Sequence, residues 1–440
     1  MNRPTRRISL FQVALCSGVI AATATGAVFT ADRSVKAALQ DSPKSVLDEA
    51  WQIVNREYVD GTFNKTDWQA VRQSLLGREY SSRQQAYIAL RDALKKLDDP
   101  YTRFMDPKQF EALTNQTSGE LSGVGIRLEQ NEQTKVLTVV EPLENSPAIR
   151  AGIKTGDRVL AINGRSTKGM SVEDASNLIR GEAGTKVTLQ IGRDGAPNFD
   201  LPLTRARIEL QAVRASVKQE GKNKIGYIRL SEFSSHAAEQ MERAIRNLND
   251  QKVDAFVLDL RGNPGGLLQA SIDISRMWLN QGAIVKTVNR QGVGDTAYAR
   301  GRQLTRLPLA VIVDGRSASS SEILAGALKD NKRATIVGSQ TFGKALVQSV
   351  HSLSDGSGLA VTIAHYYTPN GTDISHKGVT PDVKVDLSDA QQKFLATNPR
   401  LIGTAQDPQY ARALNFLERT ALAKPGAQQA SQQRTPANRE

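Results

Sequence analysis

A run of serines in the carboxyl-terminal half of the chain, in SASSSEILAGALKDN, is the first feature suited to chemistry. The run comprises Ser317, Ser319, Ser320 and Ser321, between a predicted buried strand at 309–313 and a predicted helix at 320–329. A serine at the start of a helix is usually an N-cap, but this run exceeds what one cap needs. The positive end of the helix dipole also stabilises a developing oxyanion, so one of these hydroxyls could act as a nucleophile.

A lysine close behind the run could activate that nucleophile. Lys344 lies in GSQTFGKALVQ, residues 338–348, in a segment that continues as a predicted strand. The field of the helix disfavours a protonated amine, so a lysine on a neighbouring strand could be neutral near pH 7 and act as a general base. Gln348 is four residues further along, so in a regular strand the two side chains share a face and the amide could hold the amine.

The N-terminus predicts that the protein is exported. Arg3, Arg6 and Arg7 precede an apolar stretch at 10–29, which is the pattern of a secretory signal with cleavage after Ala24 or Ala27. An uncleaved anchor helix is the alternative, because twenty residues can span a bilayer. Cys16, the only cysteine, falls in this segment, so the exported part has no disulfide, thiol nucleophile or thiolate metal site.

The residues around Lys344 also fit the start of a phosphate-binding loop, G-x-x-x-x-G-K. Three observations disfavour that interpretation. Ala345 stands where a magnesium-binding Ser or Thr is needed, and LVQSV alternates as a strand where a helix should begin. A compartment beyond an export signal also lacks a useful supply of ATP.

Composition limits the remaining classes of function. The chain of 440 residues is 39% hydrophobic, enough for ordinary globular cores, and carries a net charge of +12. Its basic residues are mixed with acids and form no nucleic-acid-binding motif, so we interpret the charge as a solvated surface, with attraction to an anionic membrane as an alternative. The four histidines, at 236, 351, 365 and 376, are far apart and form no HExxH; their spacing leaves a Ser-His-Asp triad open, but nothing selects one of them for it. We therefore predict no metal, no cofactor and no nucleic-acid partner.

The pattern of elements changes twice along the chain. Helices are predicted near 43–58, 67–76 and 82–97, and from 121 to about 204 short strands surround a helix at 172–179. From 224 onward strands and helices alternate: strands at 225–230, 255–258, 309–313 and 334–337, helices at 237–248, 267–279 and 320–329. This alternation predicts βαβ units with parallel strands buried on both faces. After about 387 the chain turns helical and ends in a Gln/Ala/Pro-rich tail.

Several motifs in a fixed order resemble the carboxyl-terminal processing proteases, the tail-specific family of serine endopeptidases, in their cyanobacterial type. Besides the serine run and TFGK, these motifs are LDDPYTRFM at 97–105, SGELSGVGI at 118–126, DLRGNPGG at 259–266 and YYTPNGTDISHKGVTPDV at 366–383. The resemblance implies a multidomain α/β protein whose βαβ-rich protease core is interrupted by a β-rich PDZ domain. The implied parts are a signal or anchor at 1–31, a helical region at 32–118, a PDZ domain at 119–206, a protease core at 207–387, and a C-terminal helix and disordered tail at 388–440.

The same resemblance assigns roles by motif. Ser319 would be the nucleophile, Lys344 the general base and Gln348 the residue that orients it. The oxyanion hole would combine the amide of Ser320 with that of Gly265 or Gly266, the choice between the two glycines remaining open. Ser320 replaces a frequent alanine of the family and Ala345 a frequent glycine. We interpret Asp330 as structural or as a loop partner, and Glu322 as structural.

Substrate choice would come from the PDZ domain. Gly123, Val124, Gly125 and Ile126 resemble the carboxylate-binding loop, whose amides capture a C-terminal carboxylate while the peptide adds a strand. The expected partners are proteins with a free C-terminus in the periplasm or thylakoid lumen, either many of them or one photosynthetic membrane precursor. Peripheral membrane association and homo-oligomerisation stay open. The alternative from another class is a non-catalytic PDZ scaffold or chaperone that binds exposed C-termini.

Overall fold

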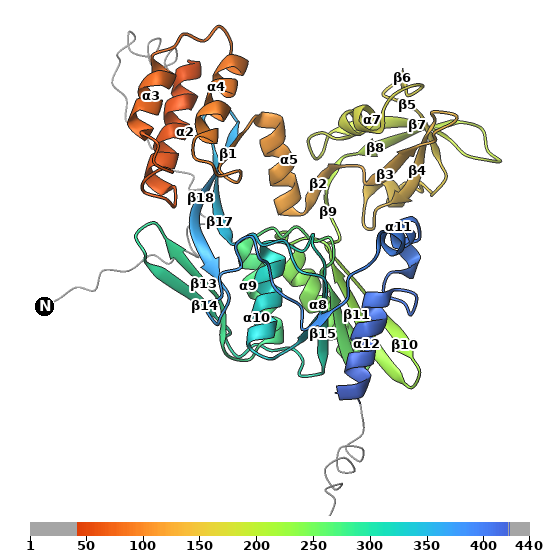
Figure 1. The fold of residues 1–440 in the computed structure, drawn as a ribbon. Coiled ribbons are helices and arrows are strands. Elements are labelled where there is room, and N and C mark those ends of the chain that lie inside the picture. The colour runs from red at the N-terminus through yellow and green to blue at the C-terminus, as the bar shows by residue number, and fades with distance from the viewer. Residues whose placement is uncertain (1–41, 421, 423–440) are drawn as a thin grey trace, which may run out of the picture. The chain divides into compact units, whose positions relative to one another are not determined.

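A computed structural model describes residues 42–420 and residue 422. The predicted export signal, its Cys16 and nearly all of the predicted tail lie outside the described residues. The chain divides into two compact units, one formed by 1–114 and 212–440 and the other by 115–211 (Figure 1). Within the described part, no helix combines the length and the apolar character needed to cross a membrane.

Three capped helices open the first unit, close to their predicted positions. They are α2 (Pro43–Glu57), α3 (Trp68–Leu76) and α4 (Arg83–Lys95). Ser42, Asp67 and Ser82 accept a hydrogen bond from a backbone N–H of the first turn, as N-caps do. Their buried faces form one apolar cluster that also includes Leu359 and Val361 of a distant strand.

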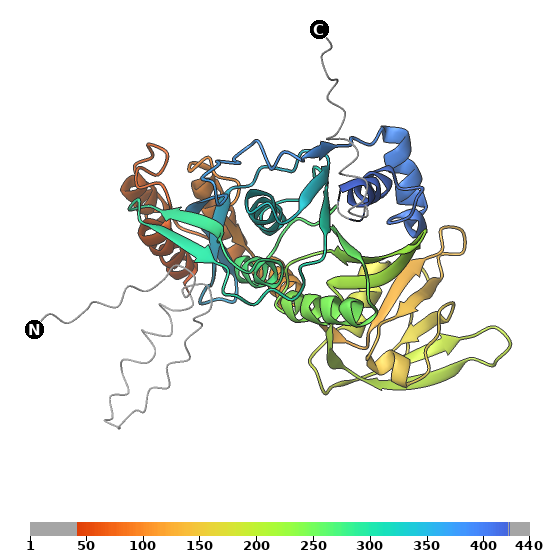
Figure 2. The same ribbon diagram turned by 90° about the horizontal axis from the view of Figure 1, so that it is seen from below.

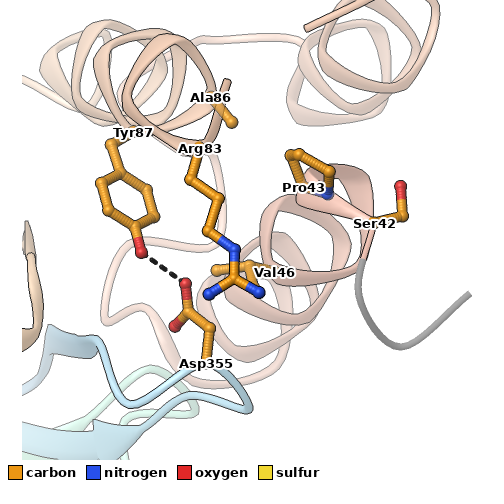
Figure 3. A pocket seen from close by; sticks show the side chains of 7 residues that line it. All are labelled: Ser42, Pro43, Val46, Arg83, Ala86, Tyr87 and Asp355. Atoms are coloured by element: carbon orange, nitrogen blue, oxygen red, sulfur yellow. Dashed lines mark hydrogen bonds between the residues drawn. The ribbon is translucent and has the colours of Figure 1, made fainter. Parts of the chain in front are cut away.

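A five-stranded, largely antiparallel sheet lies beside these helices. Its strands are β1 (Arg103–Met105), β13 (Ala283–Asn289), β14 (Gly294–Tyr298), β17 (Leu346–Ser352) and β18 (Gly358–Tyr367). β18 pairs with β1, β13 and β17, so it joins segments that are far apart in the sequence. The turn between β17 and β18 is tied to α4, since Tyr87 Oη donates to Asp355 Oδ2 at 2.6 Å (Figure 3).

A second sheet of six strands carries the catalytic candidates. Its order is β10 (Val213–Glu220), β11 (Asn223–Leu230), β12 (Ala255–Asp259), β15 (Leu309–Val313), β16 (Thr335–Gly338) and β19 (Val383–Lys384). All neighbours from β11 to β19 pair in parallel, and every residue of β12 and β15 is buried. The prediction of parallel strands buried on both faces is confirmed for these strands.

Helices cover both faces of this sheet. One cluster joins one set of strand side chains to α8 (Ala237–Asp250), α9 (Leu268–Trp278) and α10 (Ser320–Asp330). The alternate strand side chains pack against α12 (Pro408–Thr420), which lies on the opposite side of the sheet from α10 (Figure 2). Before α12 come α11 (Asp389–Thr397) and a short 3-10 helix, η2 (Pro399–Leu401).

The second unit is rich in β-structure. It contains a five-strand path of β3 (Ile126–Gln130), β4 (Leu137–Pro142), β5 (Arg158–Ile162), β7 (Lys186–Gly192) and β8 (Phe199–Thr204), with β6 (Arg165–Ser166) paired to β5. A separate pair, β2 (Glu120–Gly123) and β9 (Ala206–Glu209), brings together the two ends of the unit. The remaining helices are α5 (Pro107–Ser118), which crosses the division between the units, α6 (Pro147–Arg150) and α7 (Val172–Ile179). The apolar core of this second unit includes Val124, Val159 and Leu189, all fully buried.

Candidate active site

Hydrogen bonding and burial distinguish one serine of the run from the other three. Ser317 Oγ donates to the carbonyl of Leu260 at 2.9 Å, and Ser320 Oγ to that of Gly266 at 3.0 Å. Ser321 Oγ donates to the carbonyl of Asn263 at 2.9 Å. These three serines are at most 1% exposed, whereas Ser319 is partly exposed. The neighbours of Ser319 therefore use their hydroxyls to hold the loop 260–266 against α10, and Ser319 is the hydroxyl that solvent and substrate can reach.

Ser319 sits at the junction of β15 and α10 in an unusual conformation. Its backbone has φ 53° and ψ −114°, which a residue with a side chain rarely adopts. Strain of this kind costs about 1–3 kcal/mol and is found most often at functional sites. The next residue, Ser320, begins α10, so the positive end of an 11-residue helix faces the Ser319 side chain.

The glycine-rich loop approaches this junction closely. A Cβ on Gly265 would lie 2.8 Å from the Ala318 carbonyl oxygen and 2.9 Å from Ser319 Cβ, and both Gly265 and Gly266 have positive φ. Only glycine fits such a conformation at such a distance. The Gly265 N–H donates to Asn263 Oδ1 at 2.9 Å, whereas within residues 42–420 the Gly266 N–H has no hydrogen-bond acceptor.

A buried ionic network holds the other end of that loop. Arg261 contacts Asp259 and Asp407 at 2.6 Å each, and both carboxylates are fully buried. Burial pushes the pKa of Asp259 upward, but the Arg261 guanidinium outweighs it and holds that pKa below its usual value. Asp407 immediately precedes α12, so this ion pair attaches the C-terminal segment to Arg261 at the start of the glycine-rich loop.

Lys344 lies in the loop before β17, over an aromatic ring. Its Nζ is 4.5 Å from the centroid of the Tyr101 ring and forms no hydrogen bond with Ser319 Oγ in this structure. Burial lowers the pKa of Lys344 to about 8, and the nearby Arg103 guanidinium adds to the effect, while Asp99 and Glu322 oppose it. A lysine with this pKa is partly neutral near pH 7, as a general base requires.

Ala345, the departure from the family pattern beside this lysine, does not disturb the loop. Ala345 has a negative φ, so a glycine is not needed there. The glycine that the loop does need is Gly343, whose φ is 93° and whose Cβ would lie 2.8 Å from Lys377 N. The replacement of a frequent glycine by Ala345 therefore leaves the backbone conformation of this loop unstrained at that position.

Gln348 lies on β17, but the strand-alternation argument for its partnership with Lys344 does not apply. The strand begins at Leu346, after the lysine, and a β-bulge falls between Val347 and Gln348. The side-chain amide of Gln348 lies 3.5 Å from Thr362 Oγ1 on β18 and makes no hydrogen bond with Lys344. Gln348 is near the site, yet its orienting role stays a prediction.

The sequence analysis missed what Glu322 does here. This fully buried carboxylate accepts from the N–H of Ser319 at 2.8 Å and from the N–H of Lys344 at 3.0 Å. It also accepts from Gly343 N–H and Thr341 Oγ1, both at 2.6 Å. Burial raises the pKa of Glu322 and these donors oppose the rise. Its place three residues after an N-cap was the one signal available, and this signal indicated only a capping box.

The other singled-out residues of the core have ordinary roles. Asp330 Oδ2 accepts from the N–H of Asn370 at 2.9 Å, which makes it a loop partner. His351 Nε2 lies 2.7 Å from Glu57 Oε2, so it links β17 to α2. Within residues 42–420, no group of three or more His, Cys, Asp or Glu side chains could hold a metal ion.

The predicted carboxylate-binding loop lies in the second unit. Gly125 has φ 79°, and a Cβ there would lie 2.3 Å from Ser146 Cβ, so the position requires glycine. The carbonyls of Val124 and Gly125 accept from the N–H groups of Ala148 and Leu143, at 2.9 and 2.8 Å. Together with Gly123 and Ile126, these residues form a fixed turn between β2 and β3.

Comparison with known proteins identifies the family. Residues 224–385 match the model of Peptidase family S41, and residues 138–193 match that of the PDZ domain. A carboxyl-terminal-processing protease of the cyanobacterium Picosynechococcus sp. is 44% identical over 378 residues, which cover 85% of this chain and 89% of the relative. The chain belongs to the carboxyl-terminal-processing proteases. This is a serine-type peptidase family, and the predicted fold class, a mixed α/β protease core with a PDZ domain, is confirmed.

Two further members of the family are similar over most of their length. The chloroplastic C-terminal processing peptidase of Tetradesmus obliquus is 40% identical over 353 residues, covering 77% of this chain and 76% of the relative. A solved photosystem II D1 C-terminal processing protease is 38% identical, covers 78% of this chain and 93% of its own, and has a TM-score of 0.49.

Proposed function

We propose that this carboxyl-terminal-processing protease is a serine endopeptidase in which Ser319 is the nucleophile and Lys344 the general base. The observation that carries the proposal is that the structure distinguishes Ser319 from the other serines of the run. It is the partly exposed member of a serine run whose other hydroxyls are bound to backbone carbonyls. A buried lysine with a lowered pKa lies in the same unit, and Glu322 joins the two backbones.

The reaction follows from these positions. Neutral Lys344 accepts the proton of Ser319 Oγ as that oxygen attacks the scissile carbonyl. The N–H of Ser320 and an N–H of the Gly265-Gly266 pair hold the oxyanion. Among the described residues the Gly266 N–H has no acceptor and could bind the oxyanion directly, whereas the Gly265 N–H would first have to break its hydrogen bond with Asn263 Oδ1. Lys344 then protonates the leaving amine, and water hydrolyses the acyl-enzyme.

Two side-chain movements complete this mechanism. Nζ of Lys344 leaves the Tyr101 ring to reach Ser319 Oγ, because it contacts the ring in the present arrangement. Gln348 then holds the amine through its side-chain oxygen, turning away from Thr362. An amide suits this role because it adds no charge beside a base that must be neutral.

Substrate recognition is assigned to the PDZ domain, which we place at 119–206, between a helical region at 32–118 and the core at 207–387. Successive backbone amides of Gly123, Val124, Gly125 and Ile126 would bind the terminal carboxylate of a protein substrate. The fixed turn that these residues form supports this assignment, since binding then costs little ordering of the loop.

We further propose an exported protein that acts on a photosynthetic membrane precursor. The arginines and apolar stretch before residue 32 support export, and the cyanobacterial and chloroplastic origins of its relatives support the periplasm or thylakoid lumen. Fractionation of cells tests this location, and full-length chain confined to the cytosol would contradict it.

Ser319→Ala tests the assignment of the nucleophile. Purified wild type and Ser319→Ala are incubated with an unfolded substrate that ends in a free carboxylate, and cleavage and peptide binding are measured separately. We expect Ser319→Ala to bind the peptide and cleave nothing. Ser275→Ala is the matched control, since it removes a buried hydroxyl that donates to the carbonyl of Ser271 at 2.7 Å on α9, outside the serine run, and should keep cleavage. Proteolysis by Ser319→Ala at the wild-type rate would refute the assignment, and binding without cleavage by the wild type would support the scaffold alternative.

A further inference from the structure

A buried tyrosine on a third element touches the backbones of both catalytic candidates. Tyr366 lies on β18 and is 2% exposed. Its hydroxyl lies 3.2 Å from the carbonyl oxygen of Ser319 and also hydrogen-bonds the carbonyl oxygen of Lys344. The backbone N–H of Tyr366 donates to the carbonyl of Ala345 at 2.9 Å, so the tyrosine itself is fixed beside the lysine loop.

This hydroxyl remains a donor at every working pH. Burial, and next the negative charge of Glu322, raise the pKa of Tyr366 well above its usual value. A buried phenol normally requires a hydrogen-bond partner. Here the only acceptors that it contacts among the described residues are the two carbonyls of the site.

The position of the tyrosine complements that of Glu322. Glu322 accepts from the N–H groups of Ser319 and Lys344, and the single O–H of Tyr366 is shared between their two carbonyl oxygens. Ser319 ends the turn before α10, while Lys344 lies in the loop before β17, so no regular secondary structure sets their separation. Ser319 also has φ 53°, a conformation that persists only when its surroundings enforce it.

We propose that Tyr366 is a positioning residue that fixes the separation and orientation of the nucleophile and the general base. The inference rests on the proposed roles of Ser319 and Lys344. The hydroxyl of Tyr366 contacts the backbone carbonyls of Ser319 and Lys344, so its effect passes through the two backbones. A misplacement of about 1 Å at a catalytic group can cost about 100-fold in rate. Loss of this hydroxyl should therefore lower kcat and leave KM nearly unchanged.

Tyr366→Phe tests the inference because it removes one oxygen atom and keeps the ring. The matched control is Tyr80→Phe, which also removes a phenol that donates to a backbone carbonyl, that of Leu75 at 2.8 Å, in the N-terminal helical region. For both variants kcat and KM are measured on a quenched peptide with a free C-terminus, below the melting temperature of each variant. The rate of acylation of Ser319 by a fluorophosphonate reports the nucleophile without the substrate.

We expect Tyr366→Phe to lose about 10- to 100-fold in kcat and in acylation rate, with KM within about twofold. Tyr80→Phe should keep the wild-type rate. Replacing Tyr366 with 4-aminophenylalanine restores an N–H donor at the same place and should recover most of kcat. If Tyr366→Phe instead keeps kcat and the acylation rate within twofold of wild type, or if its loss matches that of Tyr80→Phe, the inference is overturned.

The Ser319→Ala variant separates this inference from the proposed function. Activity in Ser319→Ala would refute the assignment of the nucleophile and this inference with it. An inactive Ser319→Ala together with a fully active Tyr366→Phe would overturn only the role of the tyrosine.

Discussion

The lowered pKa of Lys344 gives the sharpest prediction. With a pKa of about 8, about one lysine in eleven is neutral at pH 7. At the ordinary value of 10.5 about one in three thousand would be neutral, so burial enlarges the active population about 300-fold. Below about pH 7 the rate should therefore rise about tenfold per pH unit, and from pH 7 to its plateau above pH 9 it should rise about tenfold in all.

Substitution of the lysine separates charge from basicity. Lys344→Arg keeps the positive charge, but a guanidinium does not deprotonate in this range, so activity should fall by about 100- to 10,000-fold. Lys344→Ala should be equally inactive and remain folded. Lys329→Arg is the matched control, because Lys329 pairs with Asp382 at 2.9 Å on the far end of α10 and should tolerate the exchange.

The assay is hydrolysis of a quenched peptide with a free C-terminus, followed from pH 5 to 10 for all four proteins. Lys344→Arg with more than a tenth of the wild-type rate would refute the general-base role. A phosphate-binding lysine predicts the opposite pattern, in which arginine keeps part of the function and ATP raises the melting temperature.

The same shift predicts how stability depends on pH. Between about pH 8 and 10.5 the unfolded chain holds the lysine proton and the folded chain has released it, so stability rises with pH across this window. The full gain is of order 3 kcal/mol. Urea unfolding of wild type and Lys344→Ala should show this gain in the wild type alone. Identical pH dependence in both proteins would contradict a lowered pKa at this site.

Three further changes test the surroundings of the site. Tyr101→Ala should admit water to Lys344, and because burial is the largest cause of the lowered pKa, its loss should outweigh the loss of the attraction between the ring and the protonated amine; the pKa then rises and the acidic limb of the rate profile moves to higher pH, whereas a limb that stays in place or moves to lower pH would contradict this balance. Gly265→Ala should lower kcat at least about 100-fold at unchanged far-UV circular dichroism, because its Cβ would lie 2.9 Å from Ser319 Cβ, and a wild-type kcat would contradict that clash. Asp407→Ala should lower the free energy of unfolding by about 3 kcal/mol in a denaturant titration, since it leaves Arg261 buried with one carboxylate fewer, and a loss under 1 kcal/mol would argue against this attachment.

The elements that carry the site were predictable because their patterns are local. The strand at 309–313 is buried at every residue, and the helix after it begins at Ser320 as predicted. An uninterrupted apolar run followed by serine caps contains this information without any tertiary contact. The parallel sheet followed from the same alternation of strands and helices.

The contacts between distant segments that complete the site could not be predicted from local sequence patterns. β18 pairs with β1 and β13, and its tyrosine reaches the serine turn across 47 residues of sequence. The Tyr101 ring comes from the segment before β1, more than 240 residues from the lysine that it contacts. Strand alternation alone also could not determine how the side chain of Gln348 faces Lys344, because β17 begins after the lysine and a bulge changes the facing of the residues beyond it. Pairings of this kind depend on the folded arrangement and leave no periodic signal.

The site combines backbones held by hydrogen bonds with a lysine amine that, among the described residues, contacts an aromatic ring and forms no hydrogen bond. Glu322 and Tyr366 hold the main chain of both catalytic candidates, so the movement that remains is rotation of the Lys344 side chain about its own bonds. A protonated amine is attracted to the face of an aromatic ring by about 1–2 kcal/mol, and a neutral amine is not. Loss of the proton therefore frees Nζ from the Tyr101 ring at the moment when it becomes able to accept the proton of Ser319. Under the proposed mechanism, deprotonation of Lys344 and its approach to Ser319 would therefore be parts of one event, and the proposed base could rest on an aromatic ring until it is neutral.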